Sequence, residues 1–173
     1  MEKKILIIRS VSFQQLDKNL IRIKETFPEP DTMFYLLTHS HGIERAQKYR
    51  LLSEIIDYQS RKDFSFFRLP KRLKKEKFYA VIVPVTNKTG AGFLNVFAMA
   101  LRIKTEKIYR CTTGSDIRQT PRKEIVSRLL KATFFSAIAF ILTLGALVML
   151  PFLILGALFL RKSHRDDAQT PCF

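Results

Sequence analysis

The residues best suited to ligand chemistry lie in one short stretch, residues 86–92, between an apolar run and an apolar helical pattern. The stretch supplies hydroxyl, amide and ammonium donors together with two glycines, at Thr86, Asn87, Lys88, Gly90 and Gly92. Backbone amides at the start of a helix attract anions, and glycine lets a phosphate approach the backbone closely. The pattern is neither a Walker loop nor a dinucleotide fingerprint, so we expect no cofactor. It is typical either of a phosphate or sugar-phosphate site or of an ordinary strand-to-helix turn.

Other side chains that could do chemistry are sparse. Ser10 and Ser12 follow the first apolar run, and they would reach a ligand at the same edge of a parallel sheet. His39 and His41 are two residues apart, but a metal site needs a third or fourth ligand and the sequence offers no cysteine-rich partner. We therefore expect no metal. No Ser-His-Asp or paired-carboxylate spacing occurs, so we assign no catalytic residue.

Six basic residues crowd the stretch 68–77, and apolar residues are interleaved with them. An amphipathic basic segment near an apolar anchor indicates contact with anionic lipid headgroups, to which each Lys or Arg contributes on the order of 1 kcal/mol. The alternative is a solvated helix whose leucines enter the core. The six residues are Arg68, Lys71, Arg72, Lys74, Lys75 and Lys77.

The spacing of apolar residues predicts the elements that position these stretches. Continuous β-branched runs indicate buried strands, which we expect at 4–9, 33–37, 54–58, 79–85 and 107–111. Helical spacing and helix-ending residues predict helices at 13–27, 43–50, 70–77 and 93–103. The predicted fold class is α/β: a Rossmann-like, mostly parallel sheet of about five strands, with right-handed crossovers that place helices on both faces.

The chain is strongly basic, with 30 Lys and Arg against 15 Asp and Glu among 173 residues. All but three of the cations precede residue 132, so the excess positive charge belongs to the front domain. Such an excess usually persists beside an anionic partner. Membrane lipid is the nearest candidate, whereas nucleic acid is not expected because the sequence shows no nucleic-acid-binding motif.

Residues 132–160 contain no charged side chain and form a candidate membrane segment. As a helix they would be about 43 Å long at ~1.5 Å per residue. A bilayer core is only about 30 Å thick and requires roughly 20 residues. The segment predicts either one tilted or kinked span or a re-entrant hairpin that turns between Gly145 and Pro151. More basic residues precede the segment than follow it, which favours a cytosolic front domain on the inner (cytoplasmic) membrane.

These patterns divide the chain into four parts. We expect an α/β domain at residues 1–120 and a basic connecting helix at 121–131. The transmembrane segment would then occupy residues 132–160, and a polar tail residues 161–173.

Three stretches resemble a known family. They are residues 4–9 (Lys-Ile-Leu-Ile-Ile-Arg), 20–28 and 69–83, and their order resembles the acceptor-side half of two-lobed glycosyltransferases of the lipopolysaccharide heptosyltransferase type. The likeness covers residues 3–115. The family's loop after the first strand carries a Gly-Asp pair whose aspartate is the expected catalytic base, but residues 10–13 hold neither residue, and Asp17 lies within the following predicted helix. Residues 132–160 stand where the family has its nucleotide-sugar lobe.

The resemblance implies a membrane-anchored, glycosyltransferase-like half-domain that acts in envelope polysaccharide or glycolipid synthesis. It would bind a phosphorylated or lipid-linked acceptor, such as a lipid-linked glycan, or recruit a soluble glycosyltransferase partner that supplies the donor lobe. Whether the chain itself is catalytic stays open. The alternative is a non-enzymatic membrane adaptor, held on anionic lipid by its basic face.

Overall fold

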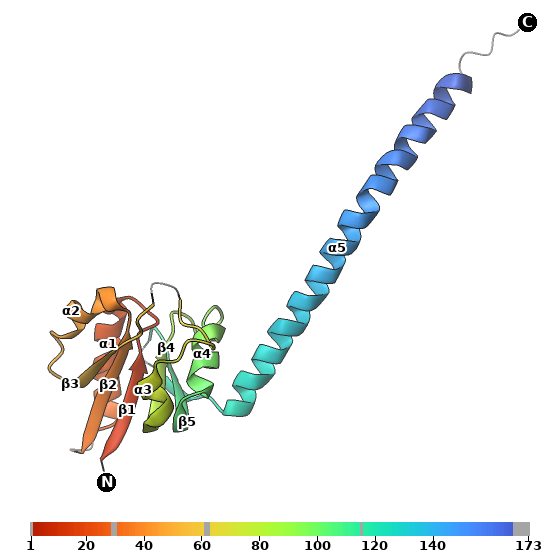
Figure 1. Ribbon diagram of the computed structural model, residues 1–173. Helices are drawn as coiled ribbons and strands as arrows, with labels where there is room; N and C mark the ends of the chain where they lie inside the picture. The colour runs from red at the N-terminus through yellow and green to blue at the C-terminus, as the bar shows by residue number, and fades with distance from the viewer. Residues whose placement is uncertain (1, 29–30, 61–62, 115, 168–173) are drawn as a thin grey trace, which may run out of the picture. The chain divides into compact units, whose positions relative to one another are not determined.

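The computed structural model describes residues 2–28, 31–60, 63–114 and 116–167, with side chains as far as residue 152. Six strands form one sheet (Figure 1): β1 (Lys3–Ile8), β2 (Thr32–Thr38), β3 (Leu52–Asp57), β4 (Lys77–Pro84), β5 (Lys104–Cys111) and β6 (Ile117–Gln119). The helices are α1 (Phe13–Thr26), η1 (Ser40–Gly42), α2 (Ile43–Ala46), α3 (Lys71–Lys75), α4 (Leu94–Leu101) and α5 (Arg122–Asp167).

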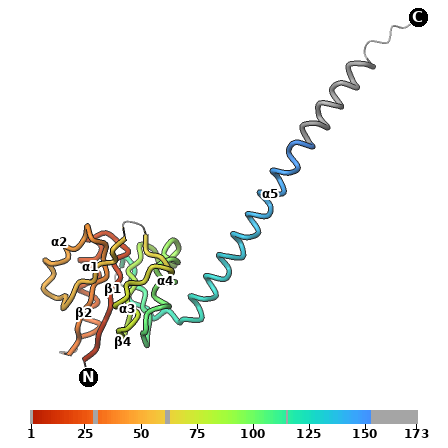
Figure 2. Tube along the Cα trace, viewed as in Figure 1, coloured from red at the N-terminus to blue at the C-terminus, as the bar shows by residue number. Residues whose placement is uncertain are grey.

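The sheet is mostly parallel, with the strand order β3-β2-β1-β4-β5-β6. β1 to β5 run parallel, and only β6 is antiparallel to its neighbour β5. The chain moves outward from β1 to β2 and β3, then returns across β1 to form β4 and β5 (Figure 2). All five predicted strands are therefore found, and the α/β class with a mostly parallel sheet is confirmed.

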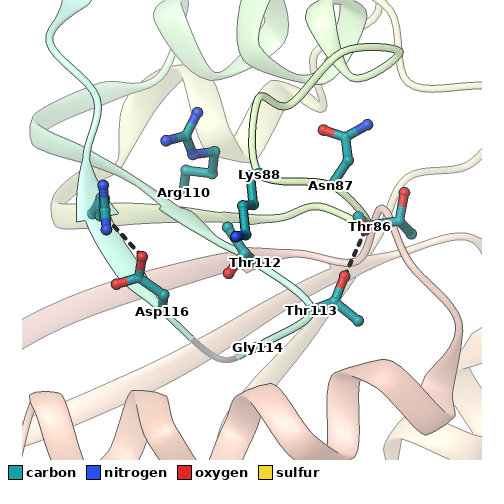
Figure 3. A pocket seen from close by; sticks show the side chains of 9 residues that line it. Thr86, Asn87, Lys88, Arg110, Thr112, Thr113, Gly114 and Asp116 are labelled. Atoms are coloured by element: carbon teal, nitrogen blue, oxygen red, sulfur yellow. Dashed lines mark hydrogen bonds and ion pairs between the residues drawn. The ribbon is translucent and has the colours of Figure 1, made fainter.

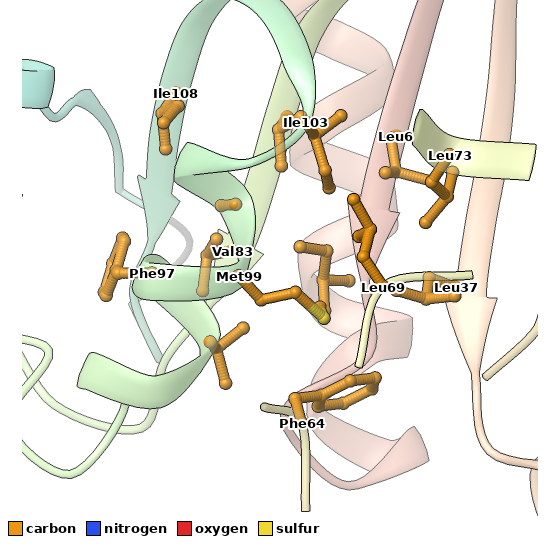
Figure 4. Packing of buried hydrophobic residues seen from close by; sticks show 14 of the residues in the cluster. Leu6, Leu37, Phe64, Leu69, Leu73, Val83, Phe97, Met99, Ile103 and Ile108 are labelled. Atoms are coloured by element: carbon orange, nitrogen blue, oxygen red, sulfur yellow. The ribbon is translucent and has the colours of Figure 1, made fainter. Parts of the chain in front are cut away.

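Helices cover both faces of the sheet because side chains alternate along each strand. Ile5 and Ile7 of β1 enter one hydrophobic core together with α1 and α2. Leu6 and Ile8 enter the other core, which α3, α4 and the first turns of α5 complete (Figure 4). All four residues are fully buried, as expected for an apolar run without polar alternation.

Two expected helices differ from the structure in length. The helix predicted at 43–50 ends at Ala46, because Lys48 and Tyr49 donate their backbone N–H groups three residues back in tight turns. The N–H of Leu52 then bonds to the Tyr49 carbonyl, which turns the chain into β3. The helix predicted at 70–77 is limited to Lys71–Lys75, because the chain becomes extended at Glu76 and enters β4.

The chain forms two compact units, Met1–Leu129 and Leu130–Phe173, and the boundary falls inside α5. α5 is continuous for 46 residues and includes Pro151. Within this described helix no turn occurs between Gly145 and Pro151, so the re-entrant hairpin is not the conformation of this structure. By length and composition α5 is the one described helix that could cross a membrane.

Leu73 tests whether the basic stretch is fixed by the core. Its side chain is fully buried within α3, so Leu73→Ala should lower the free energy of unfolding by about 2–5 kcal/mol. Lys74→Ala on the same helix removes an exposed side chain and should change stability by less than about 0.5 kcal/mol. Urea unfolding of the full chain in non-ionic detergent, followed by tyrosine near-UV dichroism, measures both. All five tyrosines lie in the α/β unit. Equal effects of the two substitutions would contradict the packing.

Candidate functional site

The carboxyl ends of β4 and β5 border a polar cavity of about 460 Å³, a volume within the range of small-molecule sites. The segment after β4 forms one wall, and β5, β6 and their connection form the other (Figure 3). We call this cavity the cationic pocket, and its lining residues are Thr86, Asn87, Lys88, Arg110, Thr112, Thr113, Gly114, Asp116 and Arg118.

Three elements each supply a cation to the cationic pocket. Lys88 comes from the loop after β4, Arg110 from β5 and Arg118 from β6. The lining includes one carboxylate, Asp116, which forms an ion pair of 2.7 Å with Nε of Arg118. Lys88 and Arg110 have no acidic partner among the residues that the structure describes. The pocket therefore holds uncompensated positive charge.

Arg110 is the most constrained of these cations. Its Nε atom is buried and has no hydrogen-bond partner in the described part of the chain. Arg110 also lies directly opposite Arg118 in the antiparallel register of β5 and β6. Like charges at such opposed positions destabilise a sheet. An anion bound between them would offset this repulsion and satisfy the buried donor.

The loop that carries Lys88 is shaped by Asn87 and by two glycines. The Asn87 side chain accepts a hydrogen bond of 2.5 Å from the Gly90 amide and donates one of 2.8 Å to the Ala91 carbonyl. Gly90 and Gly92 have φ angles of 73° and 86°, values that side chains disfavour. A Cβ atom on Gly90 would lie 3.0 Å from the Phe97 ring. The glycines thus serve the turn itself.

The loop is also attached to the start of α5. Arg128 donates a hydrogen bond to the Thr89 carbonyl, and its guanidinium forms an ion pair of 2.6 Å with Glu124 one turn earlier. Thr113 Oγ1 donates to the Thr86 carbonyl at 2.6 Å, which joins the two walls of the pocket. The loop that carries Lys88 is therefore held by the connection between β5 and β6 and by α5.

The structure divides the predicted ligand residues among three environments. Thr86, Asn87 and Lys88 line the cationic pocket. Ser10 and Gly92 line a second cavity, which we call the Arg9 cavity, and Ser10 donates a 2.5 Å hydrogen bond to the Pro84 carbonyl. Ser12 lines neither described cavity, because its hydroxyl caps α1 and accepts from the Gln15 amide at 3.4 Å.

The Gly90 side of the loop faces Phe97 and the aliphatic part of Arg110. Asp17, the carboxylate nearest to the first loop in sequence, lies within α1 as predicted and accepts a hydrogen bond from the Tyr49 hydroxyl. Burial, followed by that hydrogen bond, raises the pKa of Tyr49 to about 12. Asp17 thus joins α1 to the turn after α2, and it lines neither described cavity.

Five of the six basic residues of stretch 68–77 belong to α3 or begin β4, at its amino end, whereas Arg68 lies in the preceding loop and donates to the Ser60 hydroxyl at 3.3 Å. Arg72 is paired with Glu54 and Glu76, and Lys77 is paired with Glu106 at 3.1 Å. The remaining four are Arg68, Lys71, Lys74 and Lys75. β4 spans about 23 Å at ~3.3 Å per residue, so this stretch and the cationic pocket occupy opposite ends of the strand.

Arg110, Asp116 and Arg118 were not predicted from the sequence. A usable signal for Arg110 was its place near the end of a predicted strand, because carboxyl ends gather at one edge of a parallel sheet. Arg118 had no such signal, since β6 has only three residues and one of them is apolar. Among the described residues no group of three or more His, Cys, Asp or Glu could hold a metal.

Comparison of the chain with models of known protein families, with curated protein sequences and with solved structures gives no match.

Cys111 reports on the sheet edge beneath the pocket. Its side chain is fully buried at the end of β5, and burial, followed by the negative charge of Asp116, raises the pKa of its thiol to about 12. In a Cys172→Ser chain at pH 8, iodoacetamide should modify Cys111 about a thousandfold more slowly in the folded state than in guanidinium, because the thiolate is the reactive form. Mass spectrometry of timed samples measures this ratio. Similar rates in both states would show that the edge is open.

Proposed function

We propose that this chain is a membrane-anchored α/β protein that binds a phosphorylated ligand in the cationic pocket, next to the bilayer surface. The observation that carries the proposal is the convergence of Lys88, Arg110 and Arg118 from three elements on one cavity with a single carboxylate in its lining. Arg is suited to phosphate because its planar guanidinium donates two parallel hydrogen bonds. The lining hydroxyls of Thr112 and Thr113 add further donors.

The strand order supports a Rossmann-like assignment for the α/β unit. Its parallel strands follow the order β3-β2-β1-β4-β5, which is that of the first five strands of a doubly wound sheet. In such sheets ligands bind outside the carboxyl ends of the strands. The cationic pocket and the Arg9 cavity, which both contain predicted ligand residues, lie at those ends.

The membrane part of the proposal is supported by α5. The apolar side chains of its described part are exposed, including Phe134, Phe140 and Leu147, and a bilayer would cover them. Basic residues flank the uncharged segment, with more on its N-terminal side. We therefore propose a single tilted span in the inner membrane, with the α/β unit in the cytosol.

Only a short length of chain separates the pocket loop from the proposed span. Arg128 contacts Thr89 in the pocket loop, and the uncharged segment begins four residues later at Ala132. Four residues span at most about 14 Å even when fully extended. The short chain connection between the pocket loop and the uncharged segment supports a lipid-linked phosphate or a phospholipid headgroup as the ligand class.

Binding alone, without catalysis, is what the pocket chemistry supports. Its single lining carboxylate, Asp116, is held by Arg118, so it is not poised as a general base. The resemblance to the acceptor-side half of heptosyltransferase-type enzymes suggests the setting, envelope polysaccharide or glycolipid synthesis. In that setting the chain would present a lipid-linked acceptor to a soluble partner that carries the donor lobe.

A second candidate function is a membrane adaptor, and one observation favours it. Phe67 is 83% exposed beside Arg68 and the lysines of α3. An exposed aromatic side chain next to cations is typical of a segment that inserts into the headgroup layer. In this case the charged stretch, rather than the cationic pocket, would make the important lipid contact.

The two candidates predict different variants to be defective. Lys88→Gln and Arg110→Gln should each weaken binding of short-chain phosphatidic acid about tenfold, because each removes a charged hydrogen-bond donor. Lys74→Gln removes the same charge on exposed α3 and should have little effect. Calorimetry on the full chain in non-ionic detergent measures this. If Lys74→Gln and a variant lacking the six basic residues of 68–77 lost binding while Lys88→Gln kept it, the adaptor would be favoured.

The single span predicts that the two ends of α5 face opposite sides. In a Cys172→Ser background, Ser163→Cys should react with a membrane-impermeant maleimide from the outside of intact cells. Cys111 provides no background, because it is fully buried. Labelling only after the cells are opened would place the tail in the cytosol and overturn the single span.

A further inference from the structure

The Arg9 cavity is separate from the cationic pocket and has its own charge. It has a volume of about 360 Å³ and opens at the carboxyl ends of β1 and β2. Gly92, Phe93 and Asn95, at the start of α4, form its opposite wall. Its lining shares no residue with that of the cationic pocket. The charged or basic side chains in the lining are Arg9, His39, His41 and Asp63.

Arg9 is held in place by neutral groups. Its Nε atom donates to the Thr38 hydroxyl at 2.6 Å, and its guanidinium lies 4.7 Å from the centre of the Phe13 ring. A terminal nitrogen of Arg9 lies 3.3 Å from Nε2 of His41. A guanidinium only donates, so His41 can take part in this contact only as the acceptor. The side chain is therefore positioned before any ligand arrives.

Among the described residues, which include Asp63 in the cavity lining, none is ion-paired with Arg9. No described carboxylate lies within ion-pair distance of it; Asp57, at the end of β3, accepts instead from the Ser40 hydroxyl at 2.9 Å. Burial without an ion pair lowers the pKa of Arg9. Nearby Arg45 adds a second cation on the same Phe13 ring, at 4.9 Å. Taking a cation out of water without an anion costs free energy, so an anionic ligand would be stabilised here.

The facing wall offers donors of its own. Phe93 is the N-cap of α4, and no side chain caps this helix. Uncapped amides at a helix start attract anions. Gly92 has open space around it, since a Cβ atom at this residue would have no neighbouring atom within 4 Å. From β1 the chain continues to β2 on one side of the sheet, whereas from β4 it continues to β5 on the other side. Ligands of parallel sheets bind in the crevice between two such strands.

We propose that the Arg9 cavity is a second anion site, in which Arg9 and the first turn of α4 bind the phosphoryl group of a small organic phosphate. The site does not depend on the membrane or on the cationic pocket. With it, the carboxyl edge of the sheet would carry two phosphoryl sites on the two sides of the loop that contains Lys88. A ligand of the Arg9 cavity would be a soluble phosphate ester, because the cavity's own residues do not connect it to α5.

Inorganic phosphate is the probe that tests the site, with the full chain in non-ionic detergent. A Lys88→Gln, Arg110→Gln double variant disables the cationic pocket and should retain one phosphate per chain. Adding Arg9→Gln should weaken this remaining site about tenfold or more, because a charged, prepositioned donor is lost. Arg45→Gln is the matched control: it removes an equal charge from the same aromatic ring outside the cavity lining, and affinity should change less than about threefold.

A second pair of variants keeps the test decisive if Arg9→Gln does not fold. Asn and Asp both tolerate the positive φ of Gly92, and the open space there accepts either. Gly92→Asp should bind phosphate about tenfold more weakly than Gly92→Asn, since only Asp adds a negative charge at the cavity. Equal affinities in this pair, or equal losses in Arg9→Gln and Arg45→Gln, would overturn the second site. Loss of all phosphate binding in the double variant would overturn it as well, while leaving the cationic pocket supported.

Discussion

The enclosure of β1 is the constraint on which the rest of this α/β unit depends. β1 is hydrogen-bonded on both edges, to β2 and to β4, and Ile5–Ile8 are buried on both faces. A strand enclosed in this way excludes unpaired polar side chains along its length. Lys3 and Lys4 at one end and Arg9 and Ser10 at the other mark where polar residues become possible again. The chemistry of the unit is thereby confined to the two ends of the strands.

Cations lie at both ends of the strands, and the cavities lie at one of them. At the amino end of β4, Arg72 and Lys77 have glutamate partners. At the carboxyl ends, Arg9, Lys88 and Arg110 have no carboxylate partner among the described residues. These three cations line cavities at the carboxyl edge, which is where parallel sheets bind ligands.

The sequence was sufficient for features that depend on local pattern. The run at residues 4–9 predicted β1, and the helical spacing that begins at Phe13 predicted α1, because periodicity directly reflects which faces are buried. Ser12 has a second local role, because a serine three residues before Gln15 at a helix start resembles a capping box, and its hydroxyl caps α1. Ligand contact by Ser12 stays a prediction.

The composition of the site could not be predicted in the same way, because it depends on which strands become neighbours. Thr86 and Lys88 were identified from their loop, but their partner Arg110 is 22 positions beyond Lys88 in the chain and becomes its neighbour only through the pairing of β4 with β5. The division between two cavities also depends on strand order. Ser10 and Lys88 lie at the same sheet edge, yet they face separate spaces.

The opposed arginines of β5 and β6 are the physical basis of the proposed binding role. Stability alone would favour an oppositely charged or neutral pair at Arg110 and Arg118. Asp116 compensates only Arg118, and the buried Nε of Arg110 gains no partner among the described residues. Both features cost free energy, and one phosphate bound between the two side chains would relieve them. Arg128 ties the loop that carries Lys88 to the first turns of α5, so three elements of the α/β unit hold this side of the pocket in place.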